Sequence, residues 1–370
     1  MGCIISALAP VMWVMLCGRV LQGLGGGGLV ALSFVAMNTL FPKHLVPQAL
    51  AFVSMVWGTS AFLGPLIGGV FASYASWRQA FVFFALAALL LSVWIVRRVQ
   101  AKPPADGNQR ERFPVNRLLL LTAGVLCIAY AGADISPLRT PALIILGVLL
   151  LIWFLRVDAK AGDSRLLPLN PISLRNPLGA GLTMILCFAV ATVAITAYGP
   201  YLMTKIHGMS VLVAGYIVAC SSIGWSLAAV AVARLDEHYD RRMVLYGMLT
   251  LTLSIAGFVF SMPHGPVWLI ALFALLEGAG FGMAWTFILR LAGNIAPDSE
   301  KERIAAAIPT VHRAGYAIGA AYVGIIANTA QLDSADTIQL LQHATVWIFI
   351  ACLPFAALGL LAAWRFVRQP

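Results

Sequence analysis

Long apolar segments, separated by short clusters of charged residues, glycine and proline, dominate the chain. Runs such as 13–40 and 118–131 contain almost no charged side chain. About 20 apolar residues, at about 1.5 Å of rise each, let a helix cross the hydrocarbon core of a bilayer. The pattern therefore predicts eleven membrane-spanning helices after an apolar segment at 1–9, near residues 12–40, 49–72, 78–96, 118–135, 140–156, 178–203, 209–233, 243–262, 267–292, 303–327 and 343–367.

The composition places the chain among membrane proteins. Of the 370 residues, 61% are apolar and 10% are charged, whereas soluble domains average roughly 25% charged residues. The six cysteines all lie in apolar stretches, with no C-x-x-C pair and no histidine at ligand spacing. No nucleotide-binding loop of the G-x-x-x-x-G-K-[ST] type occurs either. We therefore expect no metal, no cofactor and no catalytic residue, so the chain is not predicted to be an enzyme.

The positive charge follows the predicted topology. The net charge is +10, and 19 of the 24 Lys and Arg residues lie on one side of the predicted spans. The other side carries three, Arg78, Arg139 and Lys205. This bias places the basic side in the cytoplasm. We expect a multi-pass protein of the cell inner membrane whose surroundings are the lipid bilayer, and we expect no nucleic-acid partner.

An internal repeat relates the two ends of the chain. Residues 10–72 resemble residues 265–327 at a constant offset of 255, and the matched pairs include Trp13 and Trp268, Gly23 and Gly278, and Gly64 and Gly319. The first predicted helix therefore matches the ninth, and the second matches the tenth. The repeat predicts two six-helix bundles in parallel orientation with two extra helices between them.

The repeat also predicts the domain organisation. Residues 1–100 are expected to hold the last three helices of the first bundle and a stub of its third helix. Residues 101–165 are expected to form a cytoplasmic linker and the two extra central helices, and residues 166–370 the C-terminal six-helix bundle. Because Met1 corresponds to Ala256, in the middle of a predicted helix, we expect the first two to three helices to be missing. The opening M-G-x-x-x-S also fits an N-myristoylation pattern, but in this setting we interpret it as accidental.

Two motifs of the first bundle are candidates for function. Arg19 and Gln22 lie in an apolar span, and an intramembrane arginine is costly unless it faces a cavity or a partner. The alternative is that Arg19 extends to the nearby membrane interface. A second predicted helix contains a glycine–proline motif, which predicts a kinked and closely packed seam. The residues of this seam are Gly58, Gly64, Pro65, Gly68 and Gly69.

A charged loop joins two helices of the second bundle on the cytoplasmic side. Such a cluster can form bonds that stabilise one conformation and break in another, so we interpret it as a latch. The alternative is a solvated turn that obeys the positive-inside rule. The latch residues are Arg234, Asp236, Asp240, Arg241 and Arg242.

Three polar residues lie near mid-membrane on consecutive predicted helices. Glu277 and Arg313 are each placed there by their distance from the helix ends, and His312 precedes Arg313. A membrane-buried acid is a natural proton carrier. The alternatives are a static Glu277–Arg313 ion pair and a His312 that is hydrogen-bonded in the interior.

Together, these motifs resemble the major facilitator superfamily. GRVLQGLG is similar to the R-x-x-Q-G motif of the family's fourth helix, and GPLIGG followed by WRQAF resembles its fifth-helix antiporter motif. ARLDEHYDRR is similar to the second-half copy of the loop motif. The resemblance is closest to the fourteen-helix drug:proton antiporter branch. It implies an all-α fold of two six-helix bundles with two extra central helices.

The resemblance also implies a function. We expect a secondary transporter that exports small amphipathic or hydrophobic compounds in exchange for protons by alternating access, with Arg19, Gln22, Glu277, His312 and Arg313 in the cavity or in proton coupling. A periplasmic adaptor protein is a further candidate partner. Two alternatives stay open: uptake or export of another metabolite or siderophore, and a truncated remnant that does not transport.

Overall fold

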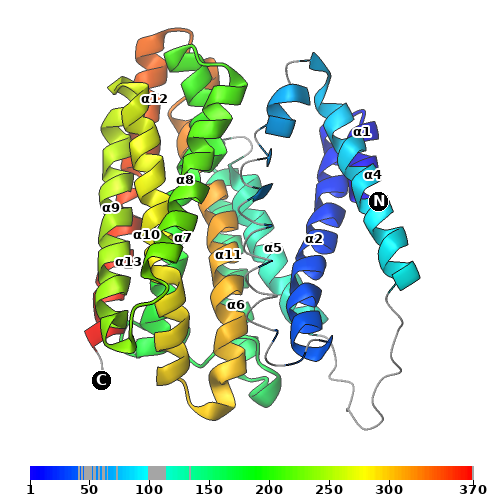
Figure 1. The fold of residues 1–370 in the computed structure, drawn as a ribbon. Coiled ribbons are helices and arrows are strands. Elements are labelled where there is room, and N and C mark those ends of the chain that lie inside the picture. Colours follow the sequence, from blue (N-terminus) through cyan, green and yellow to red (C-terminus); the bar gives the residue numbers. More distant parts are fainter. Residues whose placement is uncertain are drawn as a thin grey trace. The chain divides into compact units, whose positions relative to one another are not determined.

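The apolar runs form helices, as the sequence predicts. The computed structural model describes residues 1–40, 74–98, 114–132 and 135–368, together with residues 42, 45, 52, 56, 59, 60, 63, 64 and 66–71. These residues contain helices and no strand, which Figure 1 shows as a ribbon. They fall into two compact units, 1–110 and 111–370. The predicted boundaries at 100 and 165 stay a prediction.

The first unit is built on a long helix with a short one packed against it. Helices α1 (Gly2–Leu8) and α2 (Met12–Leu40) precede α4 (Trp77–Arg98). A Cβ atom added to Gly18 would lie 2.8 Å from the amide nitrogen of Ser6, so α1 and α2 meet backbone to backbone. The guanidinium of Arg78 also donates a hydrogen bond of 3.0 Å to the carbonyl of Ala9. The predicted helix at 49–72 and the linker at 101–113 lie largely outside the described residues.

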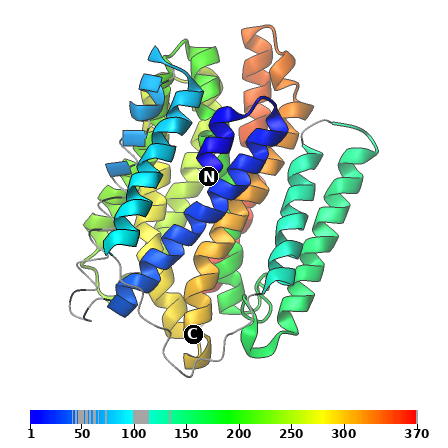
Figure 2. The same cartoon turned by 90° about the vertical axis from the view of Figure 1, so that its right-hand side faces the viewer.

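The second unit contains the two extra helices and the C-terminal bundle. Its long helices run along one another in Figure 1, and the hairpin of α5 and α6 is visible as two neighbouring helices in Figure 2. The helices are α5 (Val115–Ala131), α6 (Arg139–Ala159), α7 (Pro177–His207), α8 (Val211–Val232), α9 (Asp240–His264), α10 (Val267–Ile295), α11 (Lys301–Thr329), α12 (Ile338–Ile350) and α13 (Leu353–Arg368). Single turns of 3-10 helix lie between some of them, at Gly162–Ser164, Glu237–Tyr239, Asp298–Glu300 and Leu332–Ser334.

Helix α7 forms the centre of the second unit. It is buried along most of its length and packs against α8, α11 and α13. Its ends are defined by local chemistry. The Asn176 side chain accepts a hydrogen bond of 3.1 Å from the amide of Leu178, beside Pro177 at the first helical position. Gly208 ends the helix in the left-handed conformation, with φ of 64°, which glycine adopts without steric cost.

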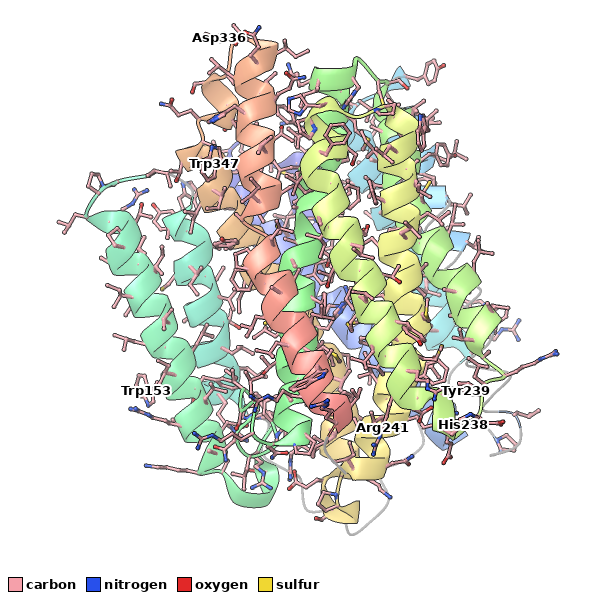
Figure 3. All side chains as sticks on the ribbon, turned by 90° about the vertical axis from the view of Figure 1, so that its left-hand side faces the viewer. Trp153, His238, Tyr239, Arg241, Asp336 and Trp347 are labelled. Carbon is pink, nitrogen blue, oxygen red and sulfur yellow. The ribbon has the colours of Figure 1, made fainter. Side chains whose placement is uncertain are left out.

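The described helices suit a membrane. Seven of them are long and apolar enough to cross a bilayer, with the pair α12–α13 taken as one span. Figure 3 shows His238, Tyr239 and Arg241 at one end of the bundle and Asp336 at the other. The charged loop before α9 and the connection before α12 therefore lie at opposite ends, as a helical bundle with alternating connections requires.

One predicted helix is broken in two. The sequence predicts a single helix at 343–367, whereas α12 ends at Ile350 and α13 begins at Leu353. Pro354 explains the difference, because it has no amide hydrogen to continue the helical bonding and its ring clashes with the preceding turn. The Tyr322 hydroxyl donates a hydrogen bond of 3.1 Å to the Ala351 carbonyl at this break.

Candidate functional site

Glycines bring the backbones of α8 and α10 into direct contact. A Cβ atom added to Gly278 would lie 2.8 Å from the Cα of Ser221, and one added to Gly282 would lie 2.7 Å from the Cα of Trp225. Both separations are far below an ordinary carbon–carbon contact of about 3.5–4.0 Å. On another side of α10, a Cβ atom on Gly280 would lie 2.6 Å from the carbonyl oxygen of Gly247 on α9. Helix α10 is thus held between α8 and α9 with no room for side chains at these positions.

Glu277 lies in this seam. It precedes Gly278 on α10, and only 3% of its surface is exposed. Its Oε2 atom is buried without a hydrogen-bond partner in the described part of the chain, and the Ser221 side chain of α8 lies near the carboxyl group. A buried carboxyl oxygen that is not hydrogen-bonded is energetically unfavourable and is a frequent mark of function.

Aromatic rings continue from Glu277 along the same face of α10. Phe281 and Trp285 follow Glu277 at four-residue spacing, which places the three side chains one above another. The Trp225 ring of α8 is stacked on Phe281 with centroids 5.5 Å apart and an interplanar angle of 22°. It also contacts the Trp285 ring at 5.7 Å. The seam glycines permit this contact, because they let the backbones of α8 and α10 touch.

His312 of α11 completes the aromatic cluster. Its ring centroid lies 5.4 Å from Phe281, 5.4 Å from Trp285 and 4.9 Å from Tyr316. The His312 Nε2 atom is buried, and no described group forms a hydrogen bond with it. The Arg313 side chain is exposed, whereas Glu277 is buried. We call Trp225, Phe281, Trp285, His312 and Tyr316 the aromatic cluster.

The candidates of the first unit lie on α2. The Arg19 Nη1 atom donates a hydrogen bond of 2.9 Å to the Gln22 side chain, and the guanidinium lies 5.7 Å from the centroid of the Phe81 ring on α4. Both α2 residues are exposed or half-buried. Their predicted role in the cavity stays a prediction.

The glycine–proline seam is only partly described. Gly58 and Pro65 lie outside the described residues. Gly64 and Gly68 have no atom within 4 Å of an added Cβ among the residues that the structure describes, whereas Gly69 is buried. The predicted packing of this helix therefore stays a prediction.

In the charged loop, Asp240 differs from its neighbours. Arg234, Asp236, Arg241 and Arg242 are exposed, whereas Asp240 is only 3% exposed at the start of α9. The Arg290 Nε atom of α10 lies 3.0 Å from each Asp240 carboxylate oxygen. The Nη2 atom of Arg290 also donates a hydrogen bond to Asp240. It donates a second hydrogen bond, of 3.3 Å, to the Leu235 carbonyl. The arginine thus joins the loop, α9 and α10.

Two further acids organise the connection between α6 and α7. Asp158 is buried, accepts a hydrogen bond of 2.8 Å from Arg117, and accepts bonds from the amides of residues 166 and 167. Glu300 accepts bonds from Arg165 and Arg303. Burial alone would raise the pKa of the Glu300 carboxyl, but the hydrogen bonds from Arg303 and Arg165 outweigh it and lower the pKa. The connection is thereby tied to the start of α11.

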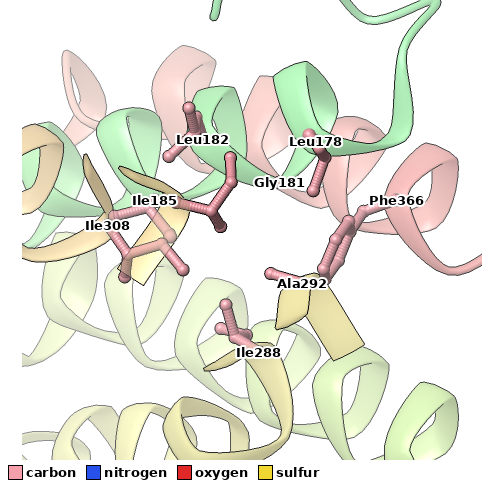
Figure 4. A pocket seen from close by; sticks show the side chains of 9 residues that line it. Leu178, Gly181, Leu182, Ile185, Ile288, Ala292, Ile308 and Phe366 are labelled. Atoms are coloured by element: carbon pink, nitrogen blue, oxygen red, sulfur yellow. The ribbon is translucent and has the colours of Figure 1, made fainter. Parts of the chain in front are cut away.

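Two other kinds of site receive no support. Within the described ranges, no group of three or more His, Cys, Asp or Glu residues could hold a metal ion. A small crevice between α7, α10, α11 and α13 is lined by apolar residues, including Gly181, Ile288 and Phe366 (Figure 4). It offers no polar group to orient a ligand, so we interpret it as a packing defect.

The sequence did not single out several residues of this candidate site. In the sequence, Arg290 is one of many basic residues on the predicted cytoplasmic side. The rings of the aromatic cluster cannot be distinguished there from other apolar side chains. The spacing of Phe281 and Trp285 from Glu277 is the one signal that marks a shared face. The pairing with Trp225 and His312 depends on tertiary structure, which the sequence does not show.

Known proteins place this arrangement in a family. The sequence model described as Major Facilitator Superfamily matches residues 1–320 and again residues 180–370. The chain belongs to this superfamily. It is therefore a multi-pass membrane transporter of small molecules with an all-α fold, and it is not an enzyme. The expectation drawn from the motifs is confirmed at this level.

The relatives of this superfamily member are transporters too. It is 29% identical over 379 aligned residues to the "Probable multidrug-efflux transporter Rv1634" of Mycobacterium tuberculosis. The alignment covers 98% of this chain and 77% of that protein. It is 24% identical to the "Multidrug efflux pump SdrM" of Staphylococcus aureus, over 77% of this chain and 63% of that one. A crystal structure of the peptide transporter POT matches with a TM-score of 0.62 at 18% identity, over 99% of this chain and 78% of that chain. The last likeness supports the fold alone.

Proposed function

We propose that this transporter exports small amphipathic or hydrophobic compounds, drugs among them, in exchange for protons. The observation that carries the proposal is Glu277, a buried carboxyl group with an oxygen that has no described hydrogen-bond partner. It lies next to the aromatic cluster. Two relatives that bear multidrug efflux names support the choice of cargo.

The chemistry of Glu277 suits an exchange. A carboxyl group is much less unfavourable in a low-dielectric site when it carries its proton than when it is charged. If the group releases the proton only when the site opens to water, binding of protons and of cargo becomes coupled through one site. Arg19 and Gln22 of α2 are the proposed polar residues of the other bundle, and Arg313 and His312 the proposed neighbours on α11.

Alternating access supplies the opening and closing. In this proposal the bundles rock about the site, and the charged loop stabilises one state through the Asp240–Arg290 pair. The glycine–proline helix of the first unit forms the seam. The basic side faces the cytoplasm, so the proposed location is the cell inner membrane. A periplasmic adaptor belongs to the same proposal as a further partner.

The proposal is tested with inside-out membrane vesicles that hold a proton gradient, reported by a pH-sensitive dye. Adding proflavine, a planar aromatic amine, should dissipate the gradient in vesicles with wild-type protein. The Glu277→Gln variant should bind proflavine and move no protons. Glu237→Gln removes an exposed acid in the loop and should behave as wild type. Full proton-coupled transport by Glu277→Gln would remove Glu277 from the mechanism.

The same assay separates export from the alternative of uptake. Export predicts that proflavine accumulates inside the inverted vesicles while protons leave them. Uptake in the cell predicts that the vesicles lose proflavine. Movement of another solute class with no response to proflavine would favour a metabolite or siderophore transporter.

A further inference from the structure

Two histidines of the second unit, each beside a tryptophan, differ in one respect. His343 of α12 is exposed, and the Trp347 Nε1 atom donates a hydrogen bond of 3.3 Å to its Nε2 atom. His312 of α11 contacts Trp285, yet its Nε2 atom is buried, and the described part of the chain supplies no hydrogen-bond partner for it. Folding has placed a polar nitrogen where the surrounding groups are aromatic.

The rings around His312 form a surface suited to a flat molecule. Trp225 and Phe281 are nearly parallel, with an interplanar angle of 22°, and offset-stacked arrangements are favourable for aromatic rings. His312, in contrast, meets Phe281 and Tyr316 edge to face, at 83° and 79°. Trp225, Trp285, His312 and Tyr316 are each half-buried rather than sealed. The cluster thus offers ring faces from α8 and α10 and one nitrogen from α11.

We infer that the aromatic cluster is the cargo-binding site, that it takes planar aromatic compounds, and that His312 Nε2 selects those with a hydrogen-bond donor at the ring edge. This inference rests on the proposed function for its cargo and adds a class and a selecting residue. A site built to hydrogen-bond a ligand rejects an analogue that lacks the bonding group, because the protein's own polar atom is then left without a partner.

A neutral imidazole suits this role. It has one nitrogen that donates and one that accepts, so a ligand N–H group can be bound without a change in charge. Glu277 lies one turn before Phe281 on α10 and remains available for the proton. Cargo selection and proton carriage are thereby assigned to different residues of neighbouring helices.

Two acridine dyes provide a matched pair of probes. Proflavine carries two amino groups with N–H donors on its planar tricyclic ring. Acridine orange has the same ring with both amino groups dimethylated, so it lacks the exocyclic N–H donors, while the protonated ring nitrogen is common to both dyes. Binding is measured by the fluorescence anisotropy of each dye with the purified full chain in lipid nanodiscs, in the absence of a proton gradient.

The variants isolate the nitrogen from the ring. His312→Phe keeps an aromatic ring and removes the hydrogen-bonding atom, so proflavine affinity should fall by about 3- to 10-fold. Acridine orange affinity should change less than about twofold, within the range of a packing adjustment. His312→Gln restores a hydrogen-bonding group and should keep proflavine binding close to wild type. His343→Phe, the matched control, should leave the affinity for both dyes unchanged.

Trp225→Ala removes a ring of the aromatic cluster and should weaken binding of both dyes. The inference is overturned if wild-type protein does not bind proflavine, if His312→Phe weakens both dyes equally, or if it weakens neither. Because binding is read at equilibrium, loss of proton coupling in Glu277→Gln would leave these ratios intact. The two proposals can therefore fail separately.

Discussion

Substitution of Gly278 by alanine should separate α8 from α10. The new Cβ atom would lie 2.8 Å from the Ser221 Cα and closer still to its carbonyl group. Normal contact between these carbons needs about 3.5–4.0 Å, so the helices must move apart by about 1 Å. Overpacking of this kind costs about 1–3 kcal/mol, and the higher helix propensity of alanine offsets at most about 1 kcal/mol. We expect a net loss of about 1–2 kcal/mol.

Gly293→Ala is the matched control in the same helix, because no atom of the described residues lies within 4 Å of an added Cβ there. It should be neutral or slightly stabilising. Thermal unfolding of the purified chain in detergent should show a midpoint about 2–6 °C lower for Gly278→Ala. Proflavine binding should weaken in parallel, since Ser221 and Trp225 move relative to Glu277. Equal midpoints for the two variants would refute the close backbone contact of α8 with α10.

Two further substitutions test the charged groups at the helix ends. Arg290→Lys removes the guanidinium that bonds both carboxylate oxygens of buried Asp240, and should destabilise the chain by about 1–3 kcal/mol in thermal unfolding. Arg241→Lys, at an exposed site, should leave the stability unchanged. Equal effects of the two substitutions would contradict the pairing of Arg290 with Asp240. Glu300→Gln removes the negative charge to which Arg165 and Arg303 donate, and leaves an amide oxygen as acceptor. Because the pKa of Glu300 is lowered in the folded chain, its stabilisation is present above its ordinary pKa of 4.5 and is lost as the pH falls through the lowered value. The difference in unfolding midpoint between wild type and Glu300→Gln should thus be largest near pH 7 and shrink in acid, and a difference independent of pH would refute this origin.

The sequence predicts the helices well, because the length and apolarity of each segment are local properties. The predicted helix at 12–40 coincides with α2, and the helix at 178–203 differs from α7 only at its ends, where Asn176 and Gly208 define the caps. The predicted span at 343–367 lies within one candidate membrane span, Ile338–Arg368. Its interruption between α12 and α13 was not predicted, since hydropathy does not register the missing amide hydrogen of Pro354.

The site was harder to predict, because its members come from separate helices. Hydropathy and spacing identify Glu277 and His312 as polar residues in apolar surroundings. They do not reveal that Trp225 stacks on Phe281, which requires the glycine seam between α8 and α10. The same limit applies to Arg290, whose partner Asp240 precedes it by 50 residues.

Polar groups in the second unit divide by how completely they are bonded. Near the ends of the helices, Asp158 and Asp240 accept hydrogen bonds from arginine to carboxylate oxygens. Glu277 and His312 each bury an atom that no described group bonds. The same is true of single atoms in Arg139, Arg165, Ser261 and Glu300. Bonded networks fix a conformation, whereas a buried polar atom without a partner lowers stability unless a ligand or a proton satisfies it. The bonded acids therefore account for the architecture. Glu277 and His312 lie beside or within the aromatic cluster, and we propose their unbonded atoms as the places where this transporter meets its proton and its cargo.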